Sequence, residues 1–260
     1  MTKNVDEVRA LTRGLRLLEI LAADPEGLAL VNISEKAKLS KSSTHRLLQT
    51  LLLNGYAMQD PSSRYYLPSY KLLSLCTNMI RDTDLYVVAH PHLEELARFT
   101  GETVHLVLLD NGDAVYVDKV ESPNAIRMYS KVGMRAPLHC TGVGKAILAQ
   151  LPEEKLGLLI ENGDLERYTD NTITDPVELH AHLGEIRERG FAVDDGEHEE
   201  QIRCIAAPLL ARNSQVVGAM SIAAVSYRVD LPKLCSWWPR LRTHVDQLNT
   251  KLIHYFDRYV

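Results

Sequence analysis

The stretch of residues 30–56 constrains the fold more than any other part of the chain, because its apolar spacing predicts two short helices separated by a tight turn. In the first helix, Ile33 and Ala37 stand four residues apart and form an inward face. Asn32 or Ser34 is placed to cap the free backbone amides of that helix.

The second helix of this pair is predicted to have an apolar side and well-defined ends. Leu39 and Ser40 form the turn before it, and the Ser40 side chain is a good N-terminal cap. Asn54 and Gly55 end it, because glycine accepts the left-handed conformation common at helix ends. The inward stripe consists of Leu47, Leu48, Leu51 and Leu52.

The first two turns of this second helix are polar and contain Lys41, Ser42, Ser43, Thr44, His45 and Arg46. Small hydroxyl residues allow a helix start to approach phosphates closely, and the longer side chains reach base edges in the major groove. The segment therefore predicts a helix that reads DNA. The alternative is an ordinary helical pair followed by a surface hairpin.

Two extended segments follow the second helix and predict a β-hairpin. Residues 56–59 and 64–67 flank Asp60-Pro61-Ser62-Ser63, four residues that favour turns. A hairpin placed directly after a recognition helix is a wing, and Arg64 is positioned to bind a neighbouring phosphate.

An earlier helix, predicted over residues 8–23, supplies the packing partner for the pair. Its apolar positions recur at steps of four, three and four residues. They are Leu11, Leu15, Leu18 and Ala22. Three helices and a wing are enough to close a small core.

The composition is ordinary for a globular protein and its length of 260 residues suits two domains. No apolar run is long enough to span a membrane and no signal core follows Met1, so we expect no membrane partner and a cytoplasmic location. The four cysteines are widely spaced, which predicts reduced thiols and neither a disulfide framework nor a zinc site.

The net charge of −5 is unevenly distributed along the chain. Residues 1–80 contain ten basic and seven acidic side chains, so the remainder carries −8. A mildly basic head on an acidic body is typical of a DNA-binding module joined to a domain with another role.

A predicted helix over residues 69–80, followed by turn-forming acidic residues, separates the two domains. We therefore expect a winged helix-turn-helix domain over residues 1–68, a linker helix over 69–81 and a second domain over 82–260. The next helix, residues 85–100, contains Pro91, which predicts a kink or a restart near His90.

The second domain is predicted to be an α+β layer structure. A turn signal at residues 110–113 joins two β-rich segments, which favours an antiparallel sheet flanked by helices. The predicted strands are residues 103–109, 114–120, 126–130, 191–193, 202–209 and 216–223, and the predicted helices are residues 141–149, 152–160, 176–189 and 231–256.

Several features of the second domain suggest enzyme chemistry, but none is a complete motif. The glycine run before Lys145 lacks the spacing of a P-loop. His139 and Cys140 are adjacent, so on a strand they point to opposite faces. His198 with Cys204 stays open on spacing alone. We predict no catalytic residue, no metal and no cofactor, with an enzyme acting through this domain as the alternative.

Together these stretches resemble the IclR family of bacterial transcription regulators over nearly the whole chain. Several motifs in one order carry the resemblance. The matching stretches are residues 12–15, 39–48, 55–56 and 66–67 in the front half, and 134–139, 141–145, 194–198 and 202–206 in the back half.

The resemblance implies a DNA-binding regulator, and we expect a repressor of a catabolic operon controlled by a small organic acid. It implies a winged helix-turn-helix, a linker helix and a GAF-like effector-binding domain. We expect a homodimer on a palindromic double-stranded operator, since half-site spacing must match a two-fold axis, and relatives often pair dimers into tetramers. A protein-interaction module stays as an alternative.

The resemblance also implies an effector site in the second domain. Its polar contacts would come from the backbone of Gly142 and Val143, and from Asp194, Cys204 and Ser221. Its apolar wall would include Met128, Ala136 and Ile202. Helix-start amides, a thiol and a hydroxyl can donate to a carboxylate, while Asp194 would accept from a hydroxyl or a hydrated carbonyl.

One position departs from the family pattern. Ala223 stands where relatives often have a second serine, and Ala136 is small for its position. Both changes enlarge the apolar wall, which predicts an effector bulkier than a two-carbon acid.

Overall fold

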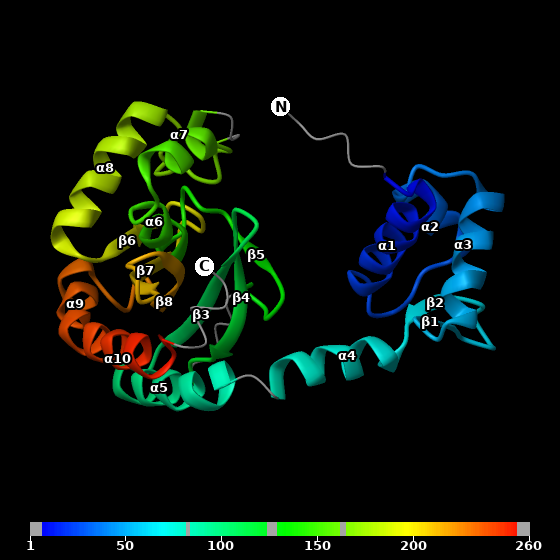
Figure 1. Ribbon diagram of the computed structural model, residues 1–260, viewed down its shortest axis with the longest axis horizontal. Coiled ribbons are helices and arrows are strands. Elements are labelled where there is room, and N and C mark those ends of the chain that lie inside the picture. The colour runs from blue at the N-terminus through cyan, green and yellow to red at the C-terminus, as the bar shows by residue number, and fades with distance from the viewer. Residues whose placement is uncertain (1–6, 82–83, 124–128, 162–164, 254–260) are drawn as a thin grey trace. The chain divides into compact units, whose positions relative to one another are not determined.

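The chain forms two units in this computed structural model, and they divide after Asp82 (Figure 1). The structure describes residues 7–81, 84–123, 129–161 and 165–253, and of residues 76–81, 84 and 161 it describes the backbone alone.

The N-terminal unit contains three helices, a hairpin and a further helix, in the predicted order. The helix pair, its turn and the hairpin after it are confirmed. The elements are α1 (Arg9–Ala22), α2 (Leu30–Lys36), α3 (Lys41–Leu53), β1 (Ala57–Gln59), β2 (Tyr66–Pro68) and α4 (Tyr70–Arg81). β1 and β2 pair antiparallel, and Leu28 bridges to Tyr66 at the outer side of the hairpin.

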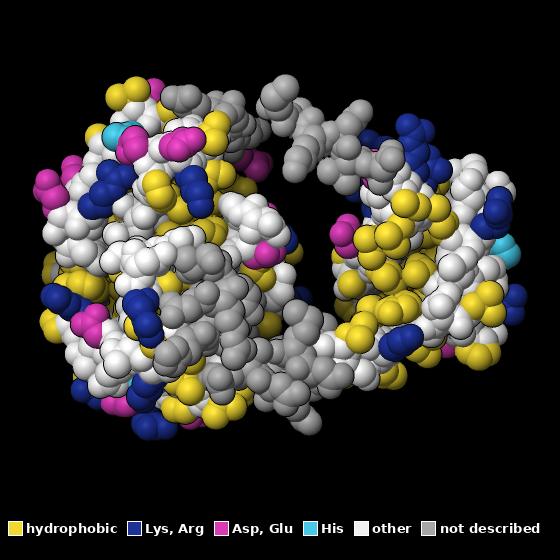
Figure 2. Space-filling model, in the orientation of Figure 1, with side chains coloured by type: hydrophobic (Ala, Val, Ile, Leu, Met, Phe, Trp, Pro, Cys, Tyr) yellow, Lys and Arg dark blue, Asp and Glu magenta, His cyan; other side chains and the backbone are white. Residues whose placement is uncertain are grey.

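The buried face of α1 differs from the predicted one. Leu17 and Leu21 are fully buried in the core, whereas Leu11 and Leu15 are 62% and 52% exposed. Apolar residues cover two adjoining faces of this helix, and the spacing rule selected the outer one. Figure 2 shows hydrophobic side chains gathered over α1, so the helix presents an apolar stripe to solvent.

The start of α2 also differs from expectation. Its N-cap is Ala29, which is extended and offers no side-chain cap. Ser34 instead lies inside the helix, where its hydroxyl donates to the Val31 carbonyl at 2.7 Å. The turn to α3 contains Lys38 in the left-handed region, with φ 54°.

The C-terminal unit combines six helices with six strands among its described residues. They are α5 (Asp84–Thr100), β3 (Thr103–Asp110), β4 (Asp113–Val120), β5 (Arg135–Ala136), α6 (Gly142–Leu148), α7 (Glu153–Glu161), α8 (Pro176–Arg189), β6 (Ala192–Asp195), β7 (Ile202–Leu210), β8 (Val216–Val225), α9 (Leu231–Ser236) and α10 (Trp238–Lys251).

Three predicted elements of this unit differ from the structure or lie partly outside its described residues. α5 continues through Pro91 without a restart. The prediction of a single C-terminal helix is wrong, because α9 ends at Ser236 and α10 begins at Trp238, with Pro239 in its first turn. Of the expected strand at residues 126–130, residues 126–128 lie outside the described residues and Tyr129 and Ser130 are not in a strand.

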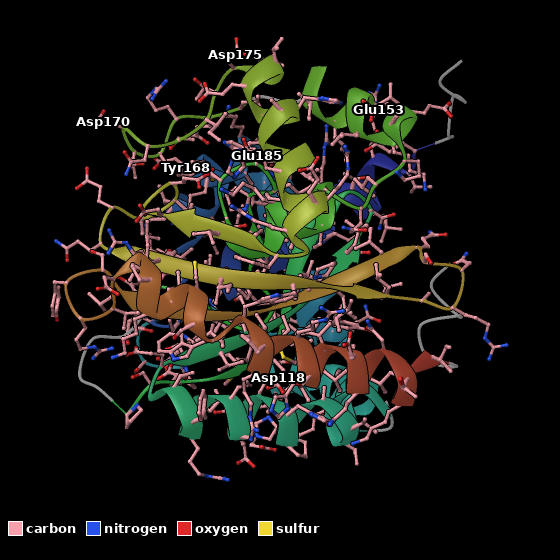
Figure 3. All side chains as sticks on the ribbon, turned by 90° about the vertical axis from the view of Figure 1, so that its left-hand side faces the viewer. Asp118, Glu153, Tyr168, Asp170, Asp175 and Glu185 are labelled. Carbon is pink, nitrogen blue, oxygen red and sulfur yellow. The ribbon has the colours of Figure 1, made fainter. Side chains whose placement is uncertain are left out.

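The strands form one antiparallel sheet in the order β5-β4-β3-β8-β7-β6. Figures 1 and 3 show this sheet between two helical layers, with α6, α7 and α8 on one face and α5, α9 and α10 on the other. A hydrophobic core fills each interface. The predicted α+β class is confirmed.

α6 lies very close to the backbone that precedes it. A Cβ on Gly144 would be 2.4 Å from the carbonyl oxygen of Leu138 and 2.5 Å from its Cα. Gly142 faces the sheet, where a Cβ would meet that of Cys204 at 3.1 Å. The two glycines therefore allow the helix to start directly above β7.

We predict that Gly144→Ala lowers the free energy of unfolding by about 3 kcal/mol, because a methyl group there collides with rigid backbone. Chemical denaturation measures the loss. Gly157→Ala is the matched control, since no atom lies within 4 Å of that Cβ in α7, and it should stabilise by about 0.5–1 kcal/mol. Equal effects of the two changes would contradict this packing.

Candidate functional site

The start of α3 presents polar side chains to solvent. Lys41, Ser42, His45 and Arg46 are exposed, and Ser43 is half-buried. The Ser40 side chain caps the helix by accepting from the Ser43 amide at 3.3 Å, as predicted. The cap fixes the helix start, so its exposed side chains project from a rigid turn.

Thr44 is an exception among the predicted DNA-binding residues. Its side chain is fully buried, and its hydroxyl donates to the Ser40 carbonyl at 3.0 Å. It precedes the buried Leu48 by one helical turn and so lies on the same inward face. The Thr44 side chain is therefore not part of the exposed surface.

The tip of the hairpin is held by a compact set of hydrogen bonds. The amides of Ser62 and Ser63 donate to one Asp60 oxygen at 2.9 and 2.7 Å. Hydrogen bonding by Ser62 and Ser63 lowers the pKa of Asp60 to about 2, so the tip keeps its acceptor at neutral pH. Arg64 follows in the left-handed region, with φ 61°, and is exposed.

The second site lies on the α6 face of the sheet and is assembled by strand register. His105 on β3 pairs with Ser221 on β8, and Cys204 on β7 pairs with both Ala223 and Asp194. Because side chains alternate along a strand, these positions share one face. The N-terminus of α6 covers them.

These residues line a cavity of about 30 Å³. Six of the eight predicted effector contacts meet there, namely Gly142, Val143, Asp194, Ile202, Cys204 and Ser221. The cavity also contains Ala223, which was expected in the wall. Its other lining residues were not selected as effector contacts from the sequence: His105, Tyr116, Ser130, Thr141, His198 and Glu199. Met128 lies outside the described residues.

Ala136 does not line this cavity. It sits on the edge strand β5, paired with Ala114, and lines a neighbouring cleft of about 430 Å³ that also contains His139 and Tyr168. The short strand β5 was not predicted, and it places Ala136 beyond β4. Of the two residues expected to enlarge the effector wall, Ala223 alone is in position.

A chain of hydrogen bonds crosses the floor of the cavity. His105 lies between the hydroxyls of Ser130, 2.8 Å from Nε2, and Ser221, 3.4 Å from Nδ1. Its ring packs against Tyr116 with centroids 5.1 Å apart. Burial, with a smaller effect of Lys119, lowers the pKa of His105 to about 3, so the imidazole is neutral. The sequence signal for this role was the presence of a histidine within the otherwise apolar predicted strand at residues 103–109.

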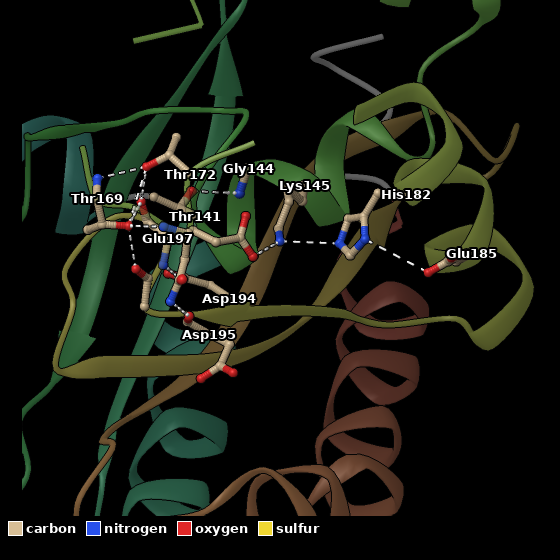
Figure 4. Close-up of polar contacts among 12 residues, drawn as sticks. Thr141, Gly144, Lys145, Thr169, Thr172, His182, Glu185, Asp194, Asp195 and Glu197 are labelled. Atoms are coloured by element: carbon tan, nitrogen blue, oxygen red, sulfur yellow. Dashed lines mark hydrogen bonds and ion pairs between the residues drawn. The ribbon is translucent and has the colours of Figure 1, made fainter. Parts of the chain in front are cut away.

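Buried acids occupy the opposite side. Asp194 is 2% exposed and accepts from the Glu197 amide at 2.8 Å. Burial raises the pKa of Asp194 to about 7. Glu197 forms an ion pair with the fully buried Lys145, whose ammonium also lies 3.3 Å from His182 Nε2 (Figure 4). Lys145 is therefore paired inside the protein and is not available to bind phosphate, which agrees with the lack of P-loop spacing in the sequence.

The thiols near the cavity are protonated. Burial raises the pKa of Cys204 far above its usual range and that of Cys140 to about 12. His139 contacts the Glu166 carbonyl at 2.8 Å, and burial lowers the pKa of His198. A nucleophilic cysteine needs a stabilised thiolate, and neither pair supplies one. No group of three metal-ligating side chains converges within the described residues.

Two stretches of the chain match models of known protein domains. Residues 10–61 match the IclR helix-turn-helix domain, and residues 77–250 match the bacterial transcriptional regulator IclR C-terminal domain. The transcriptional repressor IclR of Escherichia coli (strain K12) is 34% identical over 86% of this chain and 82% of its own length. The chain belongs to the IclR family of bacterial transcriptional regulators.

Solved structures agree with this assignment. The IclR of Thermotoga maritima is 32% identical, covers 95% of this chain and 100% of its own, and superposes with a TM-score of 0.77. The fold is shared by an IclR homologue from Microbacterium hydrocarbonoxydans complexed with 4-hydroxybenzoate, at a TM-score of 0.80 and 23% identity over 94% of this chain and 98% of that chain.

The IclR family consists of transcriptional regulators, so the regulator interpretation is confirmed over the enzyme alternative. Among the described residues, no helix is long and apolar enough to cross a lipid bilayer.

The pKa of Asp194 predicts a pH-dependent stability in this IclR-family chain. A carboxyl whose pKa is raised by folding destabilises the protein when it ionises, so the penalty is full above about pH 7 and disappears towards pH 4. Asp194→Asn should therefore raise the free energy of unfolding by about 2–4 kcal/mol at pH 8, and by less as the pH falls to about 5. Urea denaturation at both pH values checks this; a gain that is independent of pH would contradict it.

Proposed function

We propose that the protein represses a catabolic operon and that a small organic acid, bound in the β-sheet cavity, controls its affinity for operator DNA. The observation that carries this proposal is the convergence of six expected contact residues on one buried cavity of a regulator. The Escherichia coli relative is a repressor, and the Microbacterium homologue binds an organic acid, which supports both parts of the proposal.

The DNA contacts are proposed to come from α3 and the hairpin. The side chains of Lys41, Ser42, Ser43, His45 and Arg46 enter the major groove or contact its phosphates, and Arg64 contacts a phosphate beside it. Thr44 contributes by fixing the helix start rather than through its own side chain.

We propose that a homodimer binds a palindromic operator in the cytoplasm, with a dimer of dimers as a further assembly. The apolar stripe of Leu11 and Leu15 on α1, with Val8 just before the helix, supports self-association, because exposed apolar stripes mark contact surfaces. A two-fold dimer presents two α3 helices to two half-sites. The linker helix α4 joins each DNA-binding unit to its effector domain.

The cavity supports a switch because it is too small for an organic acid as it stands. Its 30 Å³ suffices for about one or two water molecules. An acid must therefore favour a conformation in which the lining moves apart, and it shifts the DNA equilibrium only by binding that conformation more tightly. The backbone amides of Gly142 and Val143 and the hydroxyl of Ser221 are the proposed donors to the ligand.

Arg46→Ala should weaken operator binding by about 1–3 kcal/mol and relax sequence preference at one position in each half-site, if the guanidinium reads a base. Titration of operator variants at fixed salt measures both effects. Arg98→Ala, an exposed arginine on α5 of the other unit, is the matched control and should leave affinity unchanged. Equal affinity of wild type and Arg46→Ala for all sequences would remove Arg46 from the reading surface.

Asp194→Ala should bind operator normally but lose the response to acid, because the side chain lies in the cavity and far in sequence from α3. DNA retention is measured while pyruvate, sugar acids and 4-hydroxybenzoate are titrated. Glu200→Ala, an exposed acid of the same turn, is the control and should respond as wild type does. An undiminished response in Asp194→Ala would contradict the proposed effector site.

A further inference from the structure

The cavity has an unusual charge balance for a site that takes an acid. Its described lining contains two carboxylates, Asp194 and Glu199, and two imidazoles, but neither lysine nor arginine. A ligand carboxylate placed there meets acidic side chains, with no cation among the described lining residues to offset them. Asp194 is buried, so its repulsion of a ligand carboxylate is weakly screened.

Lys145 is a fully buried cation near Asp194, and its ammonium is already paired. Lys145 forms an ion pair with Glu197 and contacts His182, as Figure 4 shows. Removing its ammonium from Glu197 would leave a buried, unpaired carboxylate, which is strongly unfavourable. Lys145 therefore does not serve as the counter-ion of a bound acid.

The imidazoles do not supply the missing charge. His105 is neutral because it is buried, and it already lies between two serine hydroxyls. Burial also lowers the pKa of His198. Lys119 pairs with His105 across β3 and β4, and its ammonium is already committed: it donates to the Ser130 carbonyl at 2.8 Å and forms an ion pair with Glu121 at 3.3 Å.

Among the described groups that line the cavity, Asp194 is the one whose charge can change at the lowest free-energy cost. Its side chain is almost fully buried, and the Glu197 amide occupies one of its oxygens. Burial and the charge of Glu197 raise the pKa of Asp194, while the backbone amides of Glu197 and His198 and the charge of Lys145 lower it. The titratable groups around it are Cys140 just before α6, Lys145 on α6, Tyr116 on β4, Cys204 on β7, and Glu197, His198 and Glu199 in the segment after β6.

We propose that the organic acid enters this cavity together with one proton, which Asp194 holds and donates to the carboxylate of the ligand. The inference rests on the proposed effector role of the cavity and specifies its chemistry. The Asp194 carboxylate takes up a proton from solvent to form a carboxylic acid, whose hydroxyl donates to a ligand oxygen; no bond forms between the ligand and the protein other than this hydrogen bond. Two carboxylates that share one buried proton replace two that would repel each other.

This arrangement makes acid affinity depend on pH. Above the pKa of the free Asp194 carboxyl, each increase of one pH unit should raise the Kd of a carboxylate about tenfold, because the proton must be taken up. A neutral amide analogue of the same ligand needs no proton, so its affinity should stay constant.

Isothermal titration calorimetry on the full-length protein tests the proposal, with acetate, pyruvate and 4-hydroxybenzoate as probes and 4-hydroxybenzamide as the neutral analogue. Repeating each titration in HEPES and in Tris gives the number of protons exchanged. We expect uptake of about one proton per bound acid near pH 8, and a Kd that rises about tenfold from pH 8 to pH 9.

Two variants separate this role from a structural one. Asp194→Asn supplies a permanent amide donor, so acid binding should persist without proton uptake and without pH dependence. Glu199→Gln should keep the uptake seen in wild type. Wild-type binding that is independent of pH overturns the shared proton and leaves the effector site intact. If none of the three acids binds between about pH 5 and pH 9, the effector role fails as well.

Discussion

The effector domain depends on how closely α6 can approach the sheet. Gly144 lies against the backbone of Leu138, and Gly142 lies above Cys204, at distances that exclude any larger side chain at Gly144. This contact aligns the helix start with the cavity and carries Lys145 into the interior, where Glu197 neutralises it. Because both members of that ion pair are buried, loss of either one would leave an unpaired charge. The segment that follows β6, next to Asp194, is thereby fixed to α6.

Local signals allowed much of the fold to be predicted. The Ser40 cap and the Asn54-Gly55 end define α3, and Gly190, with φ 82°, ends α8. Such ends are set by the backbone groups of a single turn, so sequence alone reveals them. The six cavity residues are different: family resemblance identified them, and the structure brings them together through register between strands far apart in the chain.

Other features depend on contacts that no local pattern encodes. α1 carries apolar residues on two faces, and spacing cannot distinguish the core face, with Leu17, from the exposed one, with Leu11. Thr44 was grouped with its polar neighbours although it faces inward. His105 takes part in the site through a hydrogen bond with Ser130, which lies 25 residues later in the chain. In each case a tertiary partner decides the role of the residue.

We propose that the exposed start of α3 reads operator sequence while the sheet domain controls when it does so. Sequencing the genomic fragments that the full-length protein retains at physiological salt tests it most directly. We expect these fragments to share an inverted repeat upstream of catabolic genes. Fragments without any common sequence would contradict it.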